Sequence, residues 1–237
     1  MKKVVFTGCP RSGTTALCTL LSHDKDILIT NEVGNFVWER DSFSDRIDKM
    51  IEKQPIKHAL SLKDINPYDF ADKVRIDPAI YCDNVNEAYG IEIVGDKLPG
   101  YGPLLKDIYH ANRDAYFLIT IRNVRHFVTS STNHYNAGRR MDWCFETIDE
   151  AQKFWVDTNA KMLENIGSII PLGAKILLIR YEDIQLDIKQ TLKKISDFLY
   201  HEIKIENPEG GFKDPIRELR KFNLSDEARW LMDLVGY

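Results

Sequence analysis

The chain has 237 residues, of which 43% are hydrophobic and 29% charged, and its formal net charge is -4. This is an ordinary globular composition, and the length is sufficient for one sizeable core, so we expect a single domain spanning residues 1–237. The negative net charge excludes the global basic field of a nucleic-acid-binding protein, so any anion site must be local.

The sequence shows no sign of export or membrane insertion. No apolar run approaches the roughly 18 residues of a membrane span. Met1-Lys2-Lys3 leads into a short strand-like run, without the apolar stretch and cleavage site of a signal peptide. The four cysteines form no C-x-x-C pair, which favours reduced thiols. We therefore expect a cytoplasmic protein with no integral membrane segment.

Short apolar runs alternate along the chain with helix-like stretches. The expected strands are Lys3–Thr7, Ile27–Thr30, Glu92–Val94, Tyr116–Ile121 and Lys175–Ile179. The expected helices are Thr14–Ser22, Tyr101–Ala111, Val124–Tyr135, Asp149–Ile166 and Ile188–Tyr200. Continuous apolar strands are typical of a sheet covered on both faces. The alternation therefore predicts an α/β fold with a central, mostly parallel five-stranded sheet.

Two segments fall outside this alternation. Residues 35–90 are polar, charged and interrupted by Pro55, Pro67 and Pro78, and we expect a helical insertion that helps to form an acceptor side. Residues 207–237 contain Gly210-Gly211 followed by a helix-like stretch rich in Arg and Lys, which is a candidate lid.

The first expected strand ends in a glycine-flanked turn, Gly8-Cys9-Pro10-Arg11-Ser12-Gly13-Thr14-Thr15, that enters a helix. Backbone N–H groups at such a helix N-terminus form an anion cradle suited to phosphate. Gly8 and Gly13 have the spacing of the Walker A loop, G-x-x-x-x-G-K-[ST], and favour a three-layer fold like that of the P-loop NTPases. However, Thr14 occupies the lysine position, and the cation comes earlier, as Arg11.

Two later segments bring further polar residues to the ends of strands. Arg122 ends the strand Tyr116–Ile121, and Ser130 lies two turns into the next helix, so the two can converge on one anion. Glu32 follows the second strand, where a carboxylate beside the phosphate loop can accept a proton. Parallel α/β folds bind their ligands at this carboxyl edge of the sheet.

These motifs resemble those of sulfotransferases that use 3′-phosphoadenosine 5′-phosphosulfate (PAPS). Pro10-Arg11-Ser12-Gly13-Thr14-Thr15 resembles their 5′-phosphosulfate loop, and Arg122 followed eight positions later by Ser130 resembles their site for the 3′-phosphate. The layout is closest to the tyrosylprotein and carbohydrate sulfotransferases. His134 stands where the protein-tyrosine branch carries a further basic residue. The resemblance implies PAPS as co-substrate and no catalytic metal.

The same resemblance implies roles for individual residues. Glu32 corresponds to the proposed base, and Lys97 in Lys97-Leu98-Pro99 corresponds to the lysine that faces the sulfuryl group. The implied catalytic residues are Arg11, Glu32 and Lys97. The implied cofactor-binding residues are Arg11, Ser12, Gly13, Thr14, Thr15, Arg122, Ser130, Tyr181 and Lys213. Glu182 and Asp183 are expected to cap the following helix or to pair with Arg180.

The sequence says less about the identity of the acceptor than about the sulfuryl donor. Tyrosylprotein sulfotransferases place arginines after the catalytic Glu, whereas this chain has Val33-Gly34-Asn35-Phe36. A hydroxylated carbohydrate, lipid-linked compound or small metabolite is therefore a better candidate than an acidic peptide. Trp38, Tyr81 and Tyr89 are either acceptor contacts or core residues. The sequence indicates no oligomeric state.

Two other functions remain open. A P-loop kinase would need a lysine at position 14 and an acidic strand end to hold Mg²⁺, for which Asp96 is a candidate. A non-catalytic nucleotide-binding module would need neither Glu32 nor Lys97.

Overall fold

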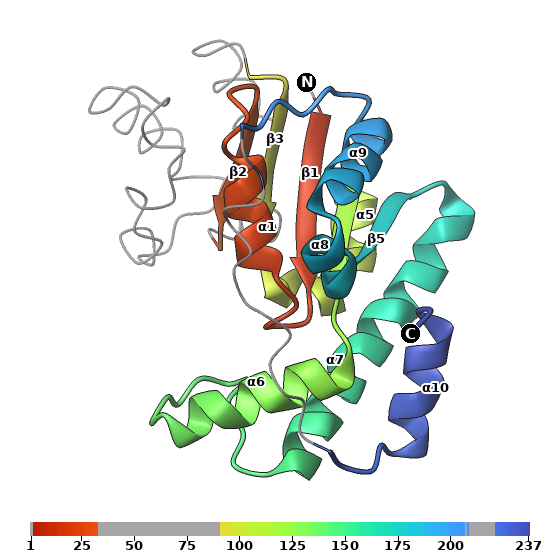
Figure 1. The fold of residues 1–237 in the computed structure, drawn as a ribbon. Helices are drawn as coiled ribbons and strands as arrows, with labels where there is room; N and C mark the ends of the chain where they lie inside the picture. Colours follow the sequence, from red (N-terminus) through yellow and green to blue (C-terminus); the bar gives the residue numbers. More distant parts are fainter. Residues whose placement is uncertain (1, 33–90, 207, 209–220) are drawn as a thin grey trace.

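The computed structural model describes residues 2–32, 91–206, 208 and 221–237 (Figure 1). Its sheet has five parallel strands in the order β2-β3-β1-β4-β5. The strands are β1 (Lys2–Gly8), β2 (Ile27–Asn31), β3 (Ile93–Lys97), β4 (Tyr116–Ile121) and β5 (Lys175–Arg180). The prediction of a central parallel sheet of five strands is confirmed.

Helices cover both faces of the sheet (Figure 1). The helices of the described residues are α1 (Thr14–Leu21), the 3-10 helix η2 (Pro99–Leu104), α5 (Leu105–Ala111), α6 (Val124–Asn136), α7 (Ile148–Ile169), the 3-10 helix η3 (Ile170–Leu172), α8 (Tyr181–Leu186), α9 (Ile188–Leu199) and α10 (Asp226–Leu234). The expected three-layer α/β fold is therefore present.

Alternate residues of the central strand bury their side chains in opposite layers. Val4 and Phe6 pack into a core shared with α1, α8 and α9, which includes Leu17 and Ile195. Val5 faces the other way, into a core built from η2, α5 and α7. A strand covered on both faces must be apolar on both, which explains the continuous apolar runs in the sequence.

A third apolar cluster lies away from the sheet, between α6, α7 and α10. Phe127, Trp155 and Leu231 are its buried members from these three helices. The predicted lid is described at residues 208 and 221–237, and its second part contains a helix packed on α7. Whether residues 207–237 act as a lid stays a prediction, and the predicted insertion at 35–90 lies outside the described residues.

The boundaries differ from the expected ones where charge or proline interrupts the pattern. The third strand runs on through Asp96 and Lys97, both fully buried, although the sequence predicted its end at Val94. The helix expected from Tyr101 is a 3-10 helix up to Leu104, with prolines at its first position and inside it. Helix α8 was not predicted. Within the described part of the chain, no helix has the length and apolar character needed to span a membrane.

Candidate active site

The turn between β1 and α1 has the geometry of an anion cradle. Gly13 is the N-cap of α1 and has φ 83°, a left-handed conformation that favours glycine. A Cβ at Gly13 would lie 2.3 Å from the Tyr181 ring, and a Cβ at Gly8 would lie 2.3 Å from Thr120 O. The loop therefore packs tightly against the ends of β4 and β5, and only glycine fits at these two positions.

The Ser12 hydroxyl of the loop is held by a hydrogen bond with the neighbouring strand β4. Ser12 Oγ and Thr120 Oγ1 are 2.8 Å apart and both residues are buried. The Thr14 side chain is also buried, whereas Thr15 is exposed. The position that carries lysine in a Walker A loop thus holds a buried hydroxyl and no charge.

Lys97 connects the loop to Glu32. Its Nζ donates to Thr15 Oγ1 at 2.9 Å and to Glu32 Oε1 at 2.6 Å. The Lys97 side chain is completely buried, while that of Glu32 is 46% exposed. Glu32 N also donates to Lys97 O at 2.6 Å, so the pair is joined through both backbone and side chain. A cation and a half-exposed carboxylate therefore adjoin the anion cradle.

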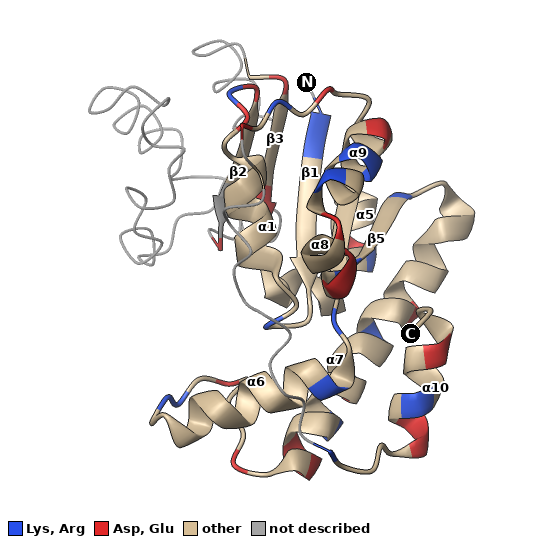
Figure 2. Cartoon of the chain, in the orientation of Figure 1, with Lys and Arg blue, Asp and Glu red and all other residues tan. Residues whose placement is uncertain are grey.

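Arg11 brings the second predicted anion site to the same loop. Its Nε donates to Ser130 Oγ at 3.2 Å, and its carbonyl accepts from Arg122 Nη1 at 2.7 Å. Burial lowers the pKa of the Arg11 guanidinium, and the nearby positive charge of Arg122 lowers it further. Two guanidinium groups held together in a partly buried position favour a bound anion. Over the rest of the described residues, positive and negative side chains are interspersed (Figure 2), so this concentration is local.

Aromatic rings order both arginines. The Arg122 guanidinium carbon lies 4.2 Å from the centroid of the Tyr181 ring, and that of Arg11 lies 4.9 Å from the Trp143 ring. His134 packs edge-on against Trp143 at 5.2 Å. Tyr181 therefore contacts both Gly13 and Arg122, and joins the two halves of the predicted cofactor site.

The backbone around Arg122 is held at three consecutive residues. Trp155 Nε1 donates to Arg122 O at 2.9 Å. Glu182 Oε1 accepts from Asn123 N at 3.2 Å. The Tyr237 hydroxyl lies 3.1 Å from Ile121 O and also hydrogen-bonds with Glu182. We call these side chains of Trp155, Glu182 and Tyr237 the Arg122 clamp.

The clamp contains a buried charge. Burial alone would raise the pKa of Glu182, but hydrogen bonds from His126 and Tyr237 outweigh it and hold that pKa below its ordinary value. His126 Nδ1 is 2.7 Å from Glu182 Oε1. Burial and the Glu182 charge raise the pKa of Tyr237, so its hydroxyl keeps the proton that it donates.

Two predicted catalytic residues share an unusual backbone conformation. Arg11 has φ 67° and Glu32 has φ 62°. Positive φ is uncommon outside glycine, and such residues concentrate at ligand clamps and active sites. Arg11 lies in the loop itself, and Glu32 is joined to the loop through Lys97.

Of the predicted site residues, the structure brings together Arg11, Ser12, Gly13, Thr14, Thr15, Glu32, Lys97, Arg122, Ser130 and Tyr181. Lys213 lies outside the described residues. Asp183 pairs with Arg180, as expected, at 2.7 Å. Glu182 instead belongs to the clamp, which the sequence analysis missed together with Trp143, because their partners are far apart in the chain.

Comparisons with known proteins agree with this geometry. The profile of the sulfotransferase family matches residues 4–204. No curated protein sequence matches the chain. Among solved structures, the sulfotransferase domain from the curacin biosynthetic pathway aligns with a TM-score of 0.65 and 15% identity, covering 100% of this chain and 98% of that one.

Two further structures are similar in fold. The sulfotransferase domain of the Synechococcus PCC 7002 olefin synthase has a TM-score of 0.61 and 16% identity, with coverage of 100% and 94%. A sulfotransferase from Alicyclobacillus acidocaldarius has a TM-score of 0.55 and 16% identity, with coverage of 99% and 96%. At these identities the structural similarity concerns the fold alone.

Proposed function

The chain belongs to the sulfotransferase family, and from that premise we propose that it transfers a sulfuryl group from PAPS to the hydroxyl of an acceptor. The observation that carries the proposal is the position of Lys97, whose Nζ bridges Glu32 Oε1 and Thr15 Oγ1. A candidate base and a candidate phosphate loop are thereby joined by one buried cation.

In this proposal Glu32 accepts the proton of the acceptor hydroxyl. The acceptor oxygen forms a bond to sulfur as the bond between sulfur and the bridging phosphate oxygen breaks, and adenosine 3′,5′-bisphosphate leaves. Lys97, Arg11 and the N–H groups of residues 12–15 stabilise the negative charge that develops on the sulfuryl oxygens and the leaving phosphate. These fixed positive groups supply the charge neutralisation, so the proposal includes no metal.

The 3′-phosphate is assigned to Arg122 and Ser130. Arg11 lies between them, since it donates to Ser130 Oγ and its carbonyl accepts from Arg122. The Arg122 guanidinium also stacks on Tyr181, which contacts Gly13. The proposed 3′-phosphate site and the phosphate loop therefore contact the same tyrosine ring. Charge-assisted contacts of this kind distinguish a bisphosphate from a nucleotide that lacks the 3′ group.

The kinase alternative finds less support. The Thr14 side chain is buried, and Asp96, the candidate for holding Mg²⁺, is fully buried and accepts from Tyr101 OH at 2.5 Å. A carboxylate held in that way is poorly placed for a metal at the strand end. A non-catalytic nucleotide-binding module would not explain why a half-exposed Glu32 adjoins the loop.

For the acceptor, we propose a hydroxylated carbohydrate, lipid-linked compound or small metabolite. The support is the sequence after Glu32, which lacks the arginines that would hold an acidic peptide. Incubating the full chain with PAPS and a panel of such acceptors, and following bisphosphate release and the mass gain of the acceptor, tests the function. Transfer of phosphate from ATP with Mg²⁺, in place of sulfuryl transfer, would overturn it.

A further inference from the structure

A second cluster of ionisable groups lies at the opposite edge of the sheet. Asp24 and Asp26 precede β2, and His201 follows α9. One ligand atom from each of these three side chains lies within 4.8 Å of the other two. Because β2 runs from Ile27 to Asn31, the cluster is about 20 Å from Glu32. It therefore takes no part in the site described above.

The His201 ring is held between two carboxylates. Nδ1 is 3.1 Å from Glu92 Oε2, and Nε2 is 3.5 Å from Asp24 Oδ2. The side chain is only 7% exposed. Among the groups that the structure describes, none makes a hydrogen bond with Nε2, which is buried. When Nδ1–H donates to Glu92, the lone pair of Nε2 points toward Asp24 Oδ2, and a bound cation or a proton on Nε2 makes that contact favourable.

Asp24 is fixed in place by the backbone. Its side chain is 1% exposed, Oδ1 accepts from Asp26 N at 2.9 Å, and Oδ2 accepts from Lys204 N at 2.7 Å. Two lysines of the flanking segments bind elsewhere, since Lys2 Nζ donates to Tyr200 O at 2.9 Å and Lys204 Nζ is 3.7 Å from Glu202. The cluster is therefore rich in negative charge.

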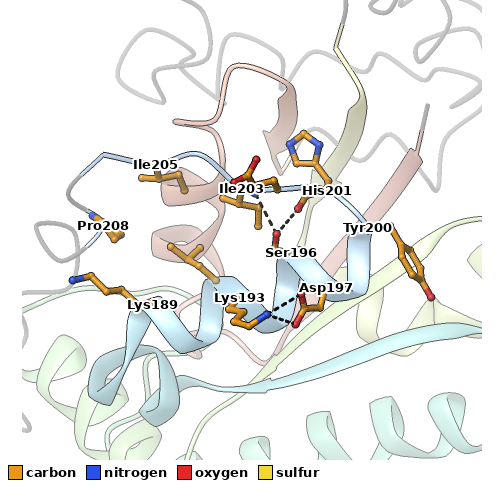
Figure 3. A pocket seen from close by; sticks show the side chains of 11 residues that line it. Lys189, Lys193, Ser196, Asp197, Tyr200, His201, Ile203, Ile205 and Pro208 are labelled. Carbon is orange, nitrogen blue, oxygen red and sulfur yellow. Dashed lines mark hydrogen bonds and ion pairs between the residues drawn. The ribbon is translucent and has the colours of Figure 1, made fainter.

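The backbone of His201 is fixed as well. Ser196 Oγ donates to His201 O and accepts from Ile203 N at 3.3 Å. Figure 3 shows the His201 ring pointing away from α9, while its carbonyl faces Ser196. With Lys193 and Tyr200, His201 lines a groove of about 840 Å³, and its ring nitrogens face Asp24 and Glu92. Its orientation is set before any ligand binds.

We propose that Asp24, Asp26 and His201 bind one divalent transition-metal ion of the Zn²⁺ type, with His201 Nε2 as the nitrogen ligand. Imidazole suits Zn²⁺ and its neighbours better than Mg²⁺ or Ca²⁺. Two tetrahedral ligands about 2.1 Å from a metal are about 3.4 Å apart, which is close to the 3.5 Å between Nε2 and Asp24 Oδ2.

Glu92 would not bind the metal itself but accepts the hydrogen bond from His201 Nδ1, on the side of the ring away from the metal. Metal-bound histidines commonly donate their other N–H to a carboxylate, which fixes the tautomer and the ring. A metal here would join the turn before β2 to the segment after α9, so its effect would be on stability and not on transfer.

Zinc binding by the chelator-stripped full chain tests the proposal, with Zn²⁺ alone as the probe in titration calorimetry and melting experiments. We expect one equivalent to bind and the melting temperature to rise. Asp26→Asn and His201→Gln should each lose about tenfold or more in affinity, and Glu92→Gln about tenfold. His23→Gln replaces an exposed neighbouring histidine and serves as the matched control. If His201→Gln fails to fold, the zinc affinity of Asp26→Asn still tests the proposal.

Four results would contradict the proposal. The first is no uptake of zinc by the parent chain. The second is equal uptake by parent and variants, which would place the ion elsewhere, for example at a cysteine. The third is a stability that depends on pH through His201 without any zinc uptake, because a proton would then occupy the position assigned to the metal. Preference for Mg²⁺ over Zn²⁺ would contradict the assigned metal class.

Discussion

Lys97 and Glu32 form an ion pair in which one partner is buried and the other is half exposed, with Lys97 Nζ 2.6 Å from Glu32 Oε1. A buried ammonium group must be paired, and the partners of Lys97 are this carboxylate and the Thr15 hydroxyl. The pair therefore fixes Glu32 beside the phosphate loop while leaving part of its carboxylate open to an incoming hydroxyl.

Glu32→Gln should lower turnover by about a hundredfold or more, the usual scale for a positioned general base. The amide keeps the size of the side chain and one acceptor oxygen for Lys97, but it cannot take a proton at neutral pH. Affinity for adenosine 3′,5′-bisphosphate should change little, and calorimetry measures it independently. Glu164→Gln, at an exposed site on α7, is the control. A variant that transfers at the parent rate would show that the proton goes elsewhere.

Arg122→Ala should remove most of the preference for adenosine 3′,5′-bisphosphate over ADP. A charge-assisted hydrogen bond is worth about 1.5–3 kcal/mol, so on the order of tenfold or more in affinity depends on the 3′-phosphate. Calorimetric titration with both nucleotides measures the ratio. Arg229→Ala, which removes an exposed arginine paired with Asp226, should leave it unchanged. Equal binding of the two nucleotides by the parent chain would refute the assignment of the 3′-phosphate site.

Gly13→Ala and Gly138→Ala separate backbone strain from loss of the phosphate loop. Both glycines have positive φ, 83° and 82°, so both substitutions should cost about 1 kcal/mol of stability through the backbone, and Gly13→Ala should cost more because of its contact with Tyr181. Only at Gly13 would the added methyl group meet the Tyr181 ring, whereas nothing lies within 4 Å of a Cβ at Gly138. Cofactor affinity should fall in Gly13→Ala alone. Equal affinities in the two variants would mean that the contact with Tyr181 is unimportant for binding.

The fold and the core of the candidate site were predictable because their signals are local. The glycine spacing around Arg11, the apolar strands and the residues at strand ends all lie within short stretches of sequence. The end of β3 was misplaced because Asp96 and Lys97 read as a strand boundary. Asp96 bonds with Tyr101, and Lys97 bonds with Thr15 and Glu32, and the positions of these partners depend on the fold.

The Arg122 clamp could not be predicted for the same reason. Glu182 follows Arg180 and precedes a helix, so its nearest partners in the sequence suggested a cap or a local ion pair. Its actual partners include Tyr237, which lies 55 residues further along. A contact of this separation leaves no periodic or motif signal in a single sequence.

Transfer should persist in excess EDTA at 25 °C. Arg11, Lys97 and Arg122 supply the positive charge around the loop, so the initial rate depends on no metal. If the proposed metal site is correct, the chelator should lower the melting temperature without slowing the initial rate. A complete loss of transfer that Mg²⁺ restores would instead favour a kinase-like mechanism.

Tyr237→Phe tests whether the clamp positions Arg122. The substitution removes the hydroxyl that bonds with Glu182 and lies 3.1 Å from Ile121 O, but it keeps the ring. We expect the KM for PAPS to rise several-fold with little change in kcat, because Arg122 binds the cofactor and does not touch the transferred group. Tyr135→Phe is the matched control, since Tyr135 OH donates to Glu146 at 2.8 Å on the exposed surface.

The same variant should alter stability in acid. The pKa of Glu182 is lower in the folded chain than in the unfolded one, so its contribution is present above the unfolded pKa and is lost as the pH falls through the acid range. Removing the Tyr237 hydroxyl raises the folded pKa toward the unfolded value. Tyr237→Phe should therefore lose about 1–3 kcal/mol at neutral pH and show a smaller further loss than the parent on acidification. Denaturant unfolding at several pH values measures both effects. Parallel curves for the parent and the variant would mean that the hydroxyl does not hold the Glu182 carboxylate, and the clamp would then rest on the hydrogen bonds of Trp155 and Glu182 to the backbone around Arg122.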